Sequence, residues 1–114
     1  MKTAQKVDSK LYTYRVSWSA EDEEFVGTCA EFPSLSWLEE DQSEALHGIC
    51  KLVAEVIEEM KETGEFIPEP LSTKSYSGKF QVRIAPSLHR NLAVKAAEEN
   101  ISLNRVVSAK LASV

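Results

Sequence analysis

The sequence is poor in the residues that build disulfide-linked, membrane-spanning or nucleotide-binding proteins. Its 114 residues include two cysteines, four glycines and four prolines. Two cysteines do not make a disulfide framework, the glycines form no phosphate-cradling loop, and no apolar run approaches the roughly 18 residues of a membrane span. The N-terminal MKTAQKVDSK has no apolar stretch of a secretory signal. We therefore expect no membrane association, a cytoplasmic location, and Cys29 and Cys50 as small buried hydrophobes.

Positive charge is scarce in the first two thirds of the chain. Residues 1–72 carry six Lys or Arg against sixteen Asp or Glu, a net charge of −10. Residues 73–114 carry seven Lys or Arg against only Glu98 and Glu99, a net charge of +5. An acidic module suits a basic protein partner and a basic module suits nucleic acid, so the two halves are expected to meet different partners.

The first half has the alternation of an antiparallel sheet. Apolar and polar side chains alternate along LYTYRVSWS, and EFVGTCAEF and SLSWLEE give two further short strands with short connections. Gly27 lies inside the second strand, which predicts a bulge or a close approach of another backbone. Together the runs predict a three-stranded meander over residues 11–40.

A long amphipathic helix is predicted after the meander. Asp41 is a suitable N-cap with Glu44 at capping-box spacing, and Gly64 is the expected left-handed stop. The apolar residues recur at helical spacing: Leu46, Ile49, Val53, Val56, Ile57 and Met60. Packed on the meander, the helix gives an α+β domain of order β-β-β-α, to which part of the following segment can add an edge strand.

The segment 66–78 has the composition of a domain boundary. Pro68 and Pro70 exclude helix, and serines and a glycine follow them. We therefore expect two domains, residues 1–72 and residues 73–114.

The second domain is predicted to have the order β-α-α. KFQVRIA, residues 79–85, alternates as a strand, and a helix opens at Pro86 or Ser87. Asn100 can take the left-handed conformation that ends this helix, and Ser102 is a natural N-cap for a last helix.

A chain of about 36 residues with a single strand rarely folds alone, because it buries too little surface and its strand has no partner. A homodimer solves both problems: strand 79–85 pairs with its own copy, and four helices cover the two-stranded sheet. The expected dimer core is Phe80, Val82, Ile84, Leu88 and Leu92. The segment resembles the ribbon-helix-helix family in its alternating strand, its PSLHRNL opening and its AAEENISLN helix junction.

The resemblance implies that the two-stranded ribbon lies in the DNA major groove with Lys79, Gln81 and Arg83 facing base edges. The chemistry agrees, because Lys and Arg donate to guanine and Gln pairs with adenine. The start of the last helix offers free backbone N–H groups to a phosphate, and Ser102, Asn104 and Arg105 lie there. Arg105 stands where a capping box has an acidic residue, which weakens the cap and favours a phosphate contact.

The N-terminal domain resembles HicB antitoxins. The features that carry the resemblance are EFVGTCAEFP, the acidic EEDQSEAL at the start of the helix, and TGEFIPEPLS after it. The resemblance implies neutralisation of a HicA-type toxin, an RNA-cleaving protein, and repression of the operon by the C-terminal domain. A basic toxin would meet acidic residues on turns and strand ends: Glu21, Asp22, Glu23, Glu24, Glu31, Glu39, Glu40 and Asp41.

The sequence has few residue patterns typical of an active site, so we expect no catalytic residues, no metal and no cofactor. The cysteines and histidines lack the spacing of a zinc site; they are Cys29, His47, Cys50 and His89. Because HicB domains are compared with a partial RNase H fold, recruitment of Glu31 and Asp41 by a metal leaves a nuclease as one alternative. A DNA-binding regulator with a ligand-sensing N-terminal domain and no toxin is another.

Overall fold

The computed structural model describes residues 8–114. The expectation about a secretory signal rests on MKTAQKVDSK, of which residues 1–7 lie outside the described part. The chain divides into two compact units, Met1–Tyr76 and Ser77–Val114, here called the N-terminal and C-terminal units. The division lies within the segment that its prolines and serines mark as a boundary. Within residues 8–114, no helix has the length and apolarity that a membrane crossing requires.

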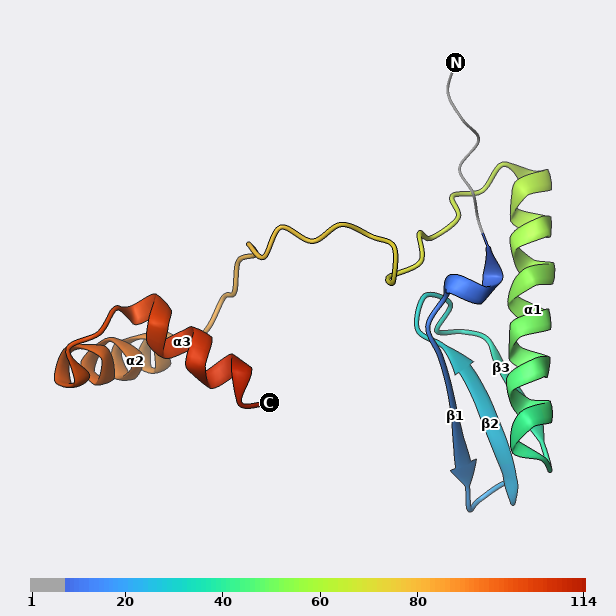
Figure 1. The fold of residues 1–114 in the computed structure, drawn as a ribbon, viewed down its shortest axis with the longest axis horizontal. Helices are drawn as coiled ribbons and strands as arrows, with labels where there is room; N and C mark the ends of the chain where they lie inside the picture. Colours follow the sequence, from blue (N-terminus) through green and yellow to red (C-terminus); the bar gives the residue numbers. More distant parts are fainter. Residues whose placement is uncertain (1–7) are drawn as a thin grey trace. The chain divides into compact units, whose positions relative to one another are not determined.

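The N-terminal unit is an α+β layer (Figure 1). After a short 3-10 turn, η1 (Ser9–Leu11), the strands β1 (Tyr14–Ser19), β2 (Glu24–Cys29) and β3 (Ser36–Glu39) form one antiparallel sheet in the order β1-β2-β3. The helix α1 (Gln42–Thr63) packs on one face of the sheet. The predicted meander and the helix that follows it are therefore confirmed.

Gly27 marks a close approach and not a bulge. The strand register passes through it without interruption, with Val16 opposite on β1 and Trp37 opposite on β3. A Cβ atom at Gly27 would lie 2.7 Å from the carbonyl oxygen of Ala45 and 2.8 Å from Cγ2 of Ile49. The absence of a side chain on β2 therefore lets the backbone of α1 approach the middle of the sheet.

The ends of α1 are those predicted from the sequence. The carboxylate of Asp41 accepts a hydrogen bond from the backbone N–H of Glu44 at 3.1 Å, and Gly64 ends the helix with φ 75°. The buried stripe differs in its first member, because Leu46 is 43% exposed and Ala45 is buried. The buried residues repeat every fourth position, as Ala45, Ile49, Val53 and Ile57, and the small Ala45 fits the close approach over Gly27.

The two cysteines differ in burial. Cys29 belongs to the core of the N-terminal unit together with Tyr12 and Phe32, and burial raises the pKa of its thiol to about 11. Cys50 is only half-buried, so the expectation of a fully buried thiol is wrong there. Burial also raises the pKa of Cys50, and both thiols are therefore protonated, and poor nucleophiles, near neutral pH.

The segment after α1 forms no strand among residues 65–72 and is instead anchored by side chains. The carboxylate of Glu31 accepts hydrogen bonds from the backbone N–H of Leu71 at 2.9 Å and from the backbone N–H and hydroxyl of Thr13 at 2.9 and 3.0 Å. The Tyr12 hydroxyl donates to the carbonyl of Pro68 at 2.5 Å, and the Ser72 hydroxyl donates to that of Leu11 at 2.6 Å. The edge strand considered from the sequence is thus replaced by a side-chain anchor.

The anchor at Glu31 is expected to open in acid. Burial alone raises the pKa of the Glu31 carboxyl, but hydrogen bonds from Leu71 and Thr13 outweigh it and hold this pKa below its usual value. A carboxyl whose pKa is lowered by folding stabilises the fold above its unfolded pKa, and this contribution is lost as the pH falls through the folded pKa. The amide shift of Leu71, followed by NMR between pH 6 and pH 2, should titrate with a midpoint below about 4.3. Glu31→Gln should abolish that transition, and a midpoint above the unfolded value would contradict the anchor.

The C-terminal unit contains two helices, α2 (Pro86–Glu99) and α3 (Leu103–Ala112). Pro86 is the first residue of α2, and Asn100 ends this helix with φ 57°. The hydroxyl of Ser102 accepts a hydrogen bond from the backbone N–H of Arg105 at 3.0 Å and caps α3. All three predicted helix boundaries are confirmed.

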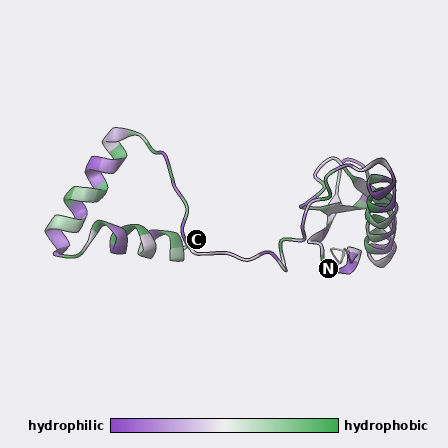
Figure 2. Ribbon diagram, turned by 90° about the horizontal axis from the view of Figure 1, so that it is seen from above, coloured by the Kyte–Doolittle hydropathy of each residue, from purple (hydrophilic) through white to green (hydrophobic). Residues whose placement is uncertain are grey.

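Residues 79–85 do not form a strand in the single chain. A strand is defined by hydrogen bonds to a neighbouring strand, and the C-terminal unit supplies no neighbour. The sequence of this segment still alternates between polar and apolar residues. The two helices of the unit carry both hydrophilic and hydrophobic residues (Figure 2). Pairing of residues 79–85 with a second copy stays a prediction.

Candidate functional site

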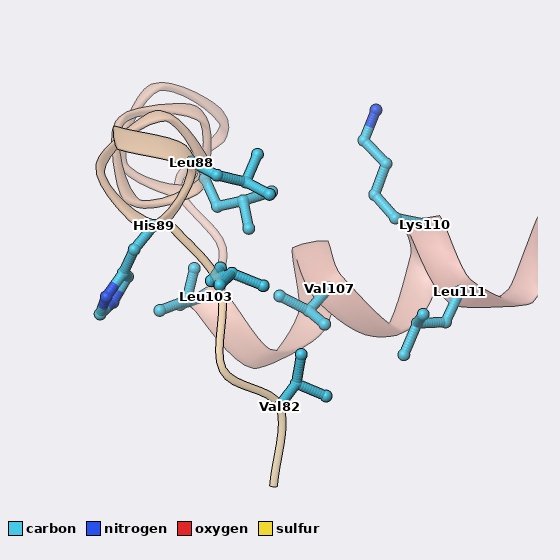
Figure 3. A pocket seen from close by; sticks show the side chains of 9 residues that line it. Val82, Leu88, His89, Leu103, Val107, Lys110 and Leu111 are labelled. Atoms are coloured by element: carbon cyan, nitrogen blue, oxygen red, sulfur yellow. The ribbon is translucent and has the colours of Figure 1, made fainter. Parts of the chain in front are cut away.

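An open apolar groove of about 510 Å³ lies in the C-terminal unit, between residues 82–84, α2 and α3 (Figure 3). Its lining residues are Val82, Ile84, Leu88, His89, Leu92, Leu103, Val107, Lys110 and Leu111. Apolar side chains from the extended segment and from α3 gather around the same space: Val82, Leu103 and Val107. The ring of His89 and the ammonium of Lys110 turn away from it. The groove is therefore apolar inside and polar at its rim.

The groove gathers most of the residues expected in a dimer core. Val82, Ile84, Leu88 and Leu92 line it, whereas Phe80 does not and is 74% exposed. In the single chain Val82 is 63% exposed, and Ala96 and Val106 are the only buried residues of α2 and α3. The two helices therefore bury little between them and leave an open apolar surface of a kind that is typical of sites covered by a partner.

The structure adds three residues of α3 that the sequence reasoning did not include in the core. Leu103, Val107 and Leu111 follow at every fourth position and line the groove opposite Val82 and Leu88. The signal was present in SLNRVVSAKLASV, because this spacing places three apolar side chains on one face of a helix.

Five of the six Lys and Arg residues of the C-terminal unit form no ion pair with any residue in 8–114, and the predicted DNA contacts Lys79, Arg83 and Arg105 are among them. The two ion pairs found within residues 8–114 join Lys61 to Glu58 and Lys95 to Glu99. Lys79, Arg83 and Arg105 are exposed and take part in neither. These side chains are therefore free to meet an external anion.

The predicted DNA-contacting residues form two separate sets. Lys79, Gln81 and Arg83 are exposed and alternate with the apolar residues of the extended segment, and Gln81 and Arg83 border one open hollow. Ser102, Asn104 and Arg105 are exposed at the start of α3, where Ser102 already acts as the cap. Across the described residues, no hydrogen bond links the two sets.

The acidic residues of the N-terminal unit do not all face outward. Four of the eight that the sequence offers to a toxin are used within the unit: Glu31 in the anchor, Asp41 as the cap of α1, Glu39 accepting from the Trp37 indole at 2.8 Å, and Asp22 accepting from the Ser19 hydroxyl at 2.9 Å. Glu21, Glu23 and Glu40 are exposed. The Asp41 cap was predicted from its local spacing, whereas the role of Glu31 leaves no local pattern because Leu71 lies 40 residues away in the sequence.

Metal ligands do not converge in the part of the chain that the structure describes. Within residues 8–114, no three His, Cys, Asp or Glu side chains gather closely enough to hold a metal ion. His47 lies on α1 and His89 on α2, in different units.

Comparison with known proteins gives one result. The family model of the HicB family matches residues 62–111 and so supports membership of that family. The matched segment includes TGEFIPEPLS and nearly all of the C-terminal unit, whereas EFVGTCAEFP lies before it. Searches of the curated proteins and of the solved structures found no match.

Proposed function

We propose that this chain is the antitoxin of a HicA/HicB-type toxin-antitoxin system. The N-terminal unit binds and neutralises an RNA-cleaving toxin, and the C-terminal unit forms a ribbon-helix-helix homodimer that binds operator DNA and represses its own operon. The family match carries the antitoxin part of the proposal. The C-terminal groove carries the dimer part, since it leaves Val82, Ile84 and Leu88 uncovered in the single chain.

The dimer follows from what the C-terminal unit lacks. Residues 79–85 need a partner strand for their backbone groups, and the groove needs an apolar cover. A second copy supplies both across a two-fold axis, because its own residues 79–85 pair with the first set and its helices close over the ribbon. The proposed assembly is a homodimer or a higher homo-oligomer built from it.

DNA binding follows from the side chains that this pairing leaves outside. With Phe80, Val82 and Ile84 in the core, strand alternation places Lys79, Gln81 and Arg83 on the outer face of the ribbon. The ribbon then presents each of these side chains twice, and Arg105 at the start of α3 adds a phosphate contact on each side. The proposal needs no cofactor and assigns no catalytic residue.

Co-expression with the neighbouring open reading frame tests the proposal. A short basic product should co-purify with this chain, and the chain should rescue cells from growth arrest by that product. Gel shift with the operon's own promoter should show binding. RNA or DNA cleavage by the isolated chain in the presence of Mg²⁺ would instead favour the nuclease alternative.

Salt should weaken operator binding steeply. The dimer presents Lys79, Arg83 and Arg105 twice, and each neutralised phosphate releases condensed counterions. If about six phosphates are contacted, the affinity should fall on the order of a thousandfold between 50 and 200 mM salt. The measurement is a titration of labelled promoter DNA by fluorescence anisotropy at several salt concentrations. An affinity that does not change over this range contradicts the electrostatic account.

A further inference from the structure

One end of the N-terminal unit combines an exposed indole with exposed carboxylates. Trp18, Phe25 and Glu39 lie side by side across β1, β2 and β3. The indole of Trp18 packs edge-on against Phe25 with ring centroids 5.1 Å apart, and yet Trp18 is 55% exposed. We call Trp18, Phe25, Glu21 and Glu40 the aromatic end.

The exposure of Trp18 has a structural cause. Trp18 and Phe25 lie on the face of the sheet that α1 covers, because they are two residues from Val16 and Gly27 along their strands. At Gly27 the helix brings Ala45 and Ile49 close against the sheet. The row of Trp18 and Phe25 lies beyond that point, at the end where the β1–β2 turn and the start of α1 are both found (Figure 1).

Charge around this row has one sign. Between Arg15 and Lys51 the sequence contains no Lys or Arg. The β1–β2 turn carries Glu21 and the junction between β3 and α1 carries Glu40, both exposed. Arginine and lysine side chains can bind such a surface, because their cationic groups stack on the ring of Trp and form ion pairs with Glu.

We infer that the aromatic end is the surface through which the N-terminal unit contacts the toxin, and that the facing toxin surface is rich in Arg and Lys. The inference rests on the proposed function. The negative charge of this surface fits such an occupant, because a protein that cleaves RNA must attract phosphates and is therefore basic. Trp and Arg are the residues that most often dominate protein interfaces, and complementary charge increases the association rate. Occupation of this surface by an RNA-binding face would also keep RNA away from the toxin.

Two variants and one matched control test the inference in the full chain. Trp18→Ala removes the aromatic anchor, and Glu21→Lys/Glu40→Lys reverses two carboxylates that accept no hydrogen bond within residues 8–114. The control, Glu55→Lys/Glu59→Lys, makes the same charge change at exposed positions of α1. Thermal melting monitors the fold of each variant, and light scattering monitors its mass.

The probe is a catalytically inactive variant of the protein encoded beside this chain, titrated by calorimetry at 150 mM salt. Trp18→Ala should weaken binding by at least about 30-fold, the loss typical of an interface hot spot. Glu21→Lys/Glu40→Lys should weaken it by about tenfold or more, and the control by less than about threefold.

The outcomes separate this inference from the proposed function. If the unmodified chain does not bind the probe, the proposed function fails, and the inference fails with it. If the chain binds and neither test variant weakens binding beyond the control, only the inference fails. A change of mass in Trp18→Ala with unchanged toxin affinity would assign the aromatic end to contact between copies of this chain, and would also overturn the inference.

Discussion

Val82→Asp is expected to abolish dimerisation and operator binding together. Val82 lines the groove and, in the proposed dimer, its side chain lies in the core between the ribbon and the helices. Each dimer would then bury two carboxylates without partners, and the penalty for even one buried unpaired polar group is several kcal/mol. In the single chain Val82 is 63% exposed, so the monomer itself tolerates the charge.

Light scattering at micromolar concentration should show the mass of a monomer for Val82→Asp and of at least a dimer for the unmodified chain. Val94→Asp is the matched control, because Val94 is an exposed valine of α2 that does not line the groove. The control should keep the dimer and bind operator DNA normally. Binding of the toxin should persist in both variants, since the N-terminal unit has its own core of residues such as Tyr12, Ile49 and Val53. A monomeric unmodified chain would exclude the ribbon-helix-helix dimer.

Arg83→Ala should separate DNA binding from toxin neutralisation. Arg83 is exposed and alternates with Val82 and Ile84, so its truncation should change the free energy of unfolding by no more than about 0.5 kcal/mol. A lost bidentate contact to a base costs roughly 1–3 kcal/mol, and the dimer loses two such contacts. Operator affinity should therefore fall by well over tenfold, whereas rescue of growth from the toxin should be unchanged.

Arg90→Ala provides the comparison for Arg83→Ala. It removes the same charge from an exposed position of α2 that is not among the predicted contacts, so it should weaken operator binding much less. Gel shift measures the first function, and growth with the co-expressed toxin measures the second. If Arg83→Ala loses rescue and keeps full operator affinity, the functions of the two units are assigned the wrong way round.

Features set by neighbouring residues could be predicted from the sequence. The cap at Asp41, the left-handed residues Gly64 and Asn100, and the cap at Ser102 all depend on contacts within one turn of a helix. The alternation of apolar and polar side chains along β1 and β2 likewise predicts strands. It can be seen within each strand, without knowing which strand pairs with it.

Features set by distant contacts could not be predicted in the same way. The sequence marks Gly27 as special but cannot tell a bulge from a close approach, since the answer depends on Ala45. Leu46 has the helical spacing of a core residue, yet it is exposed. The close approach of α1 to Gly27 buries Ala45 instead. The sequence does not distinguish Glu31 from other surface carboxylates, because its partner Leu71 lies 40 residues away in the sequence.

The anchor of residues 68–72 also limits how far the two units can separate. Because hydrogen bonds hold Leu71 and Ser72 to the N-terminal unit, the tether before the expected ribbon is at most residues 73–78. Hydrogen bonds from Thr73 and Lys74 to Pro70 and from Tyr76 to Leu71 shorten it further. Fully extended, such a tether spans roughly 20 Å at about 3.4 Å per residue. In the proposed dimer, two N-terminal units would share a small volume, in which each experiences the other at an effective concentration in the millimolar range. A partner that presents two binding sites to this pair would gain avidity from the tether alone. Acid that opens the Glu31 anchor would lengthen the tether and so weaken this gain in avidity.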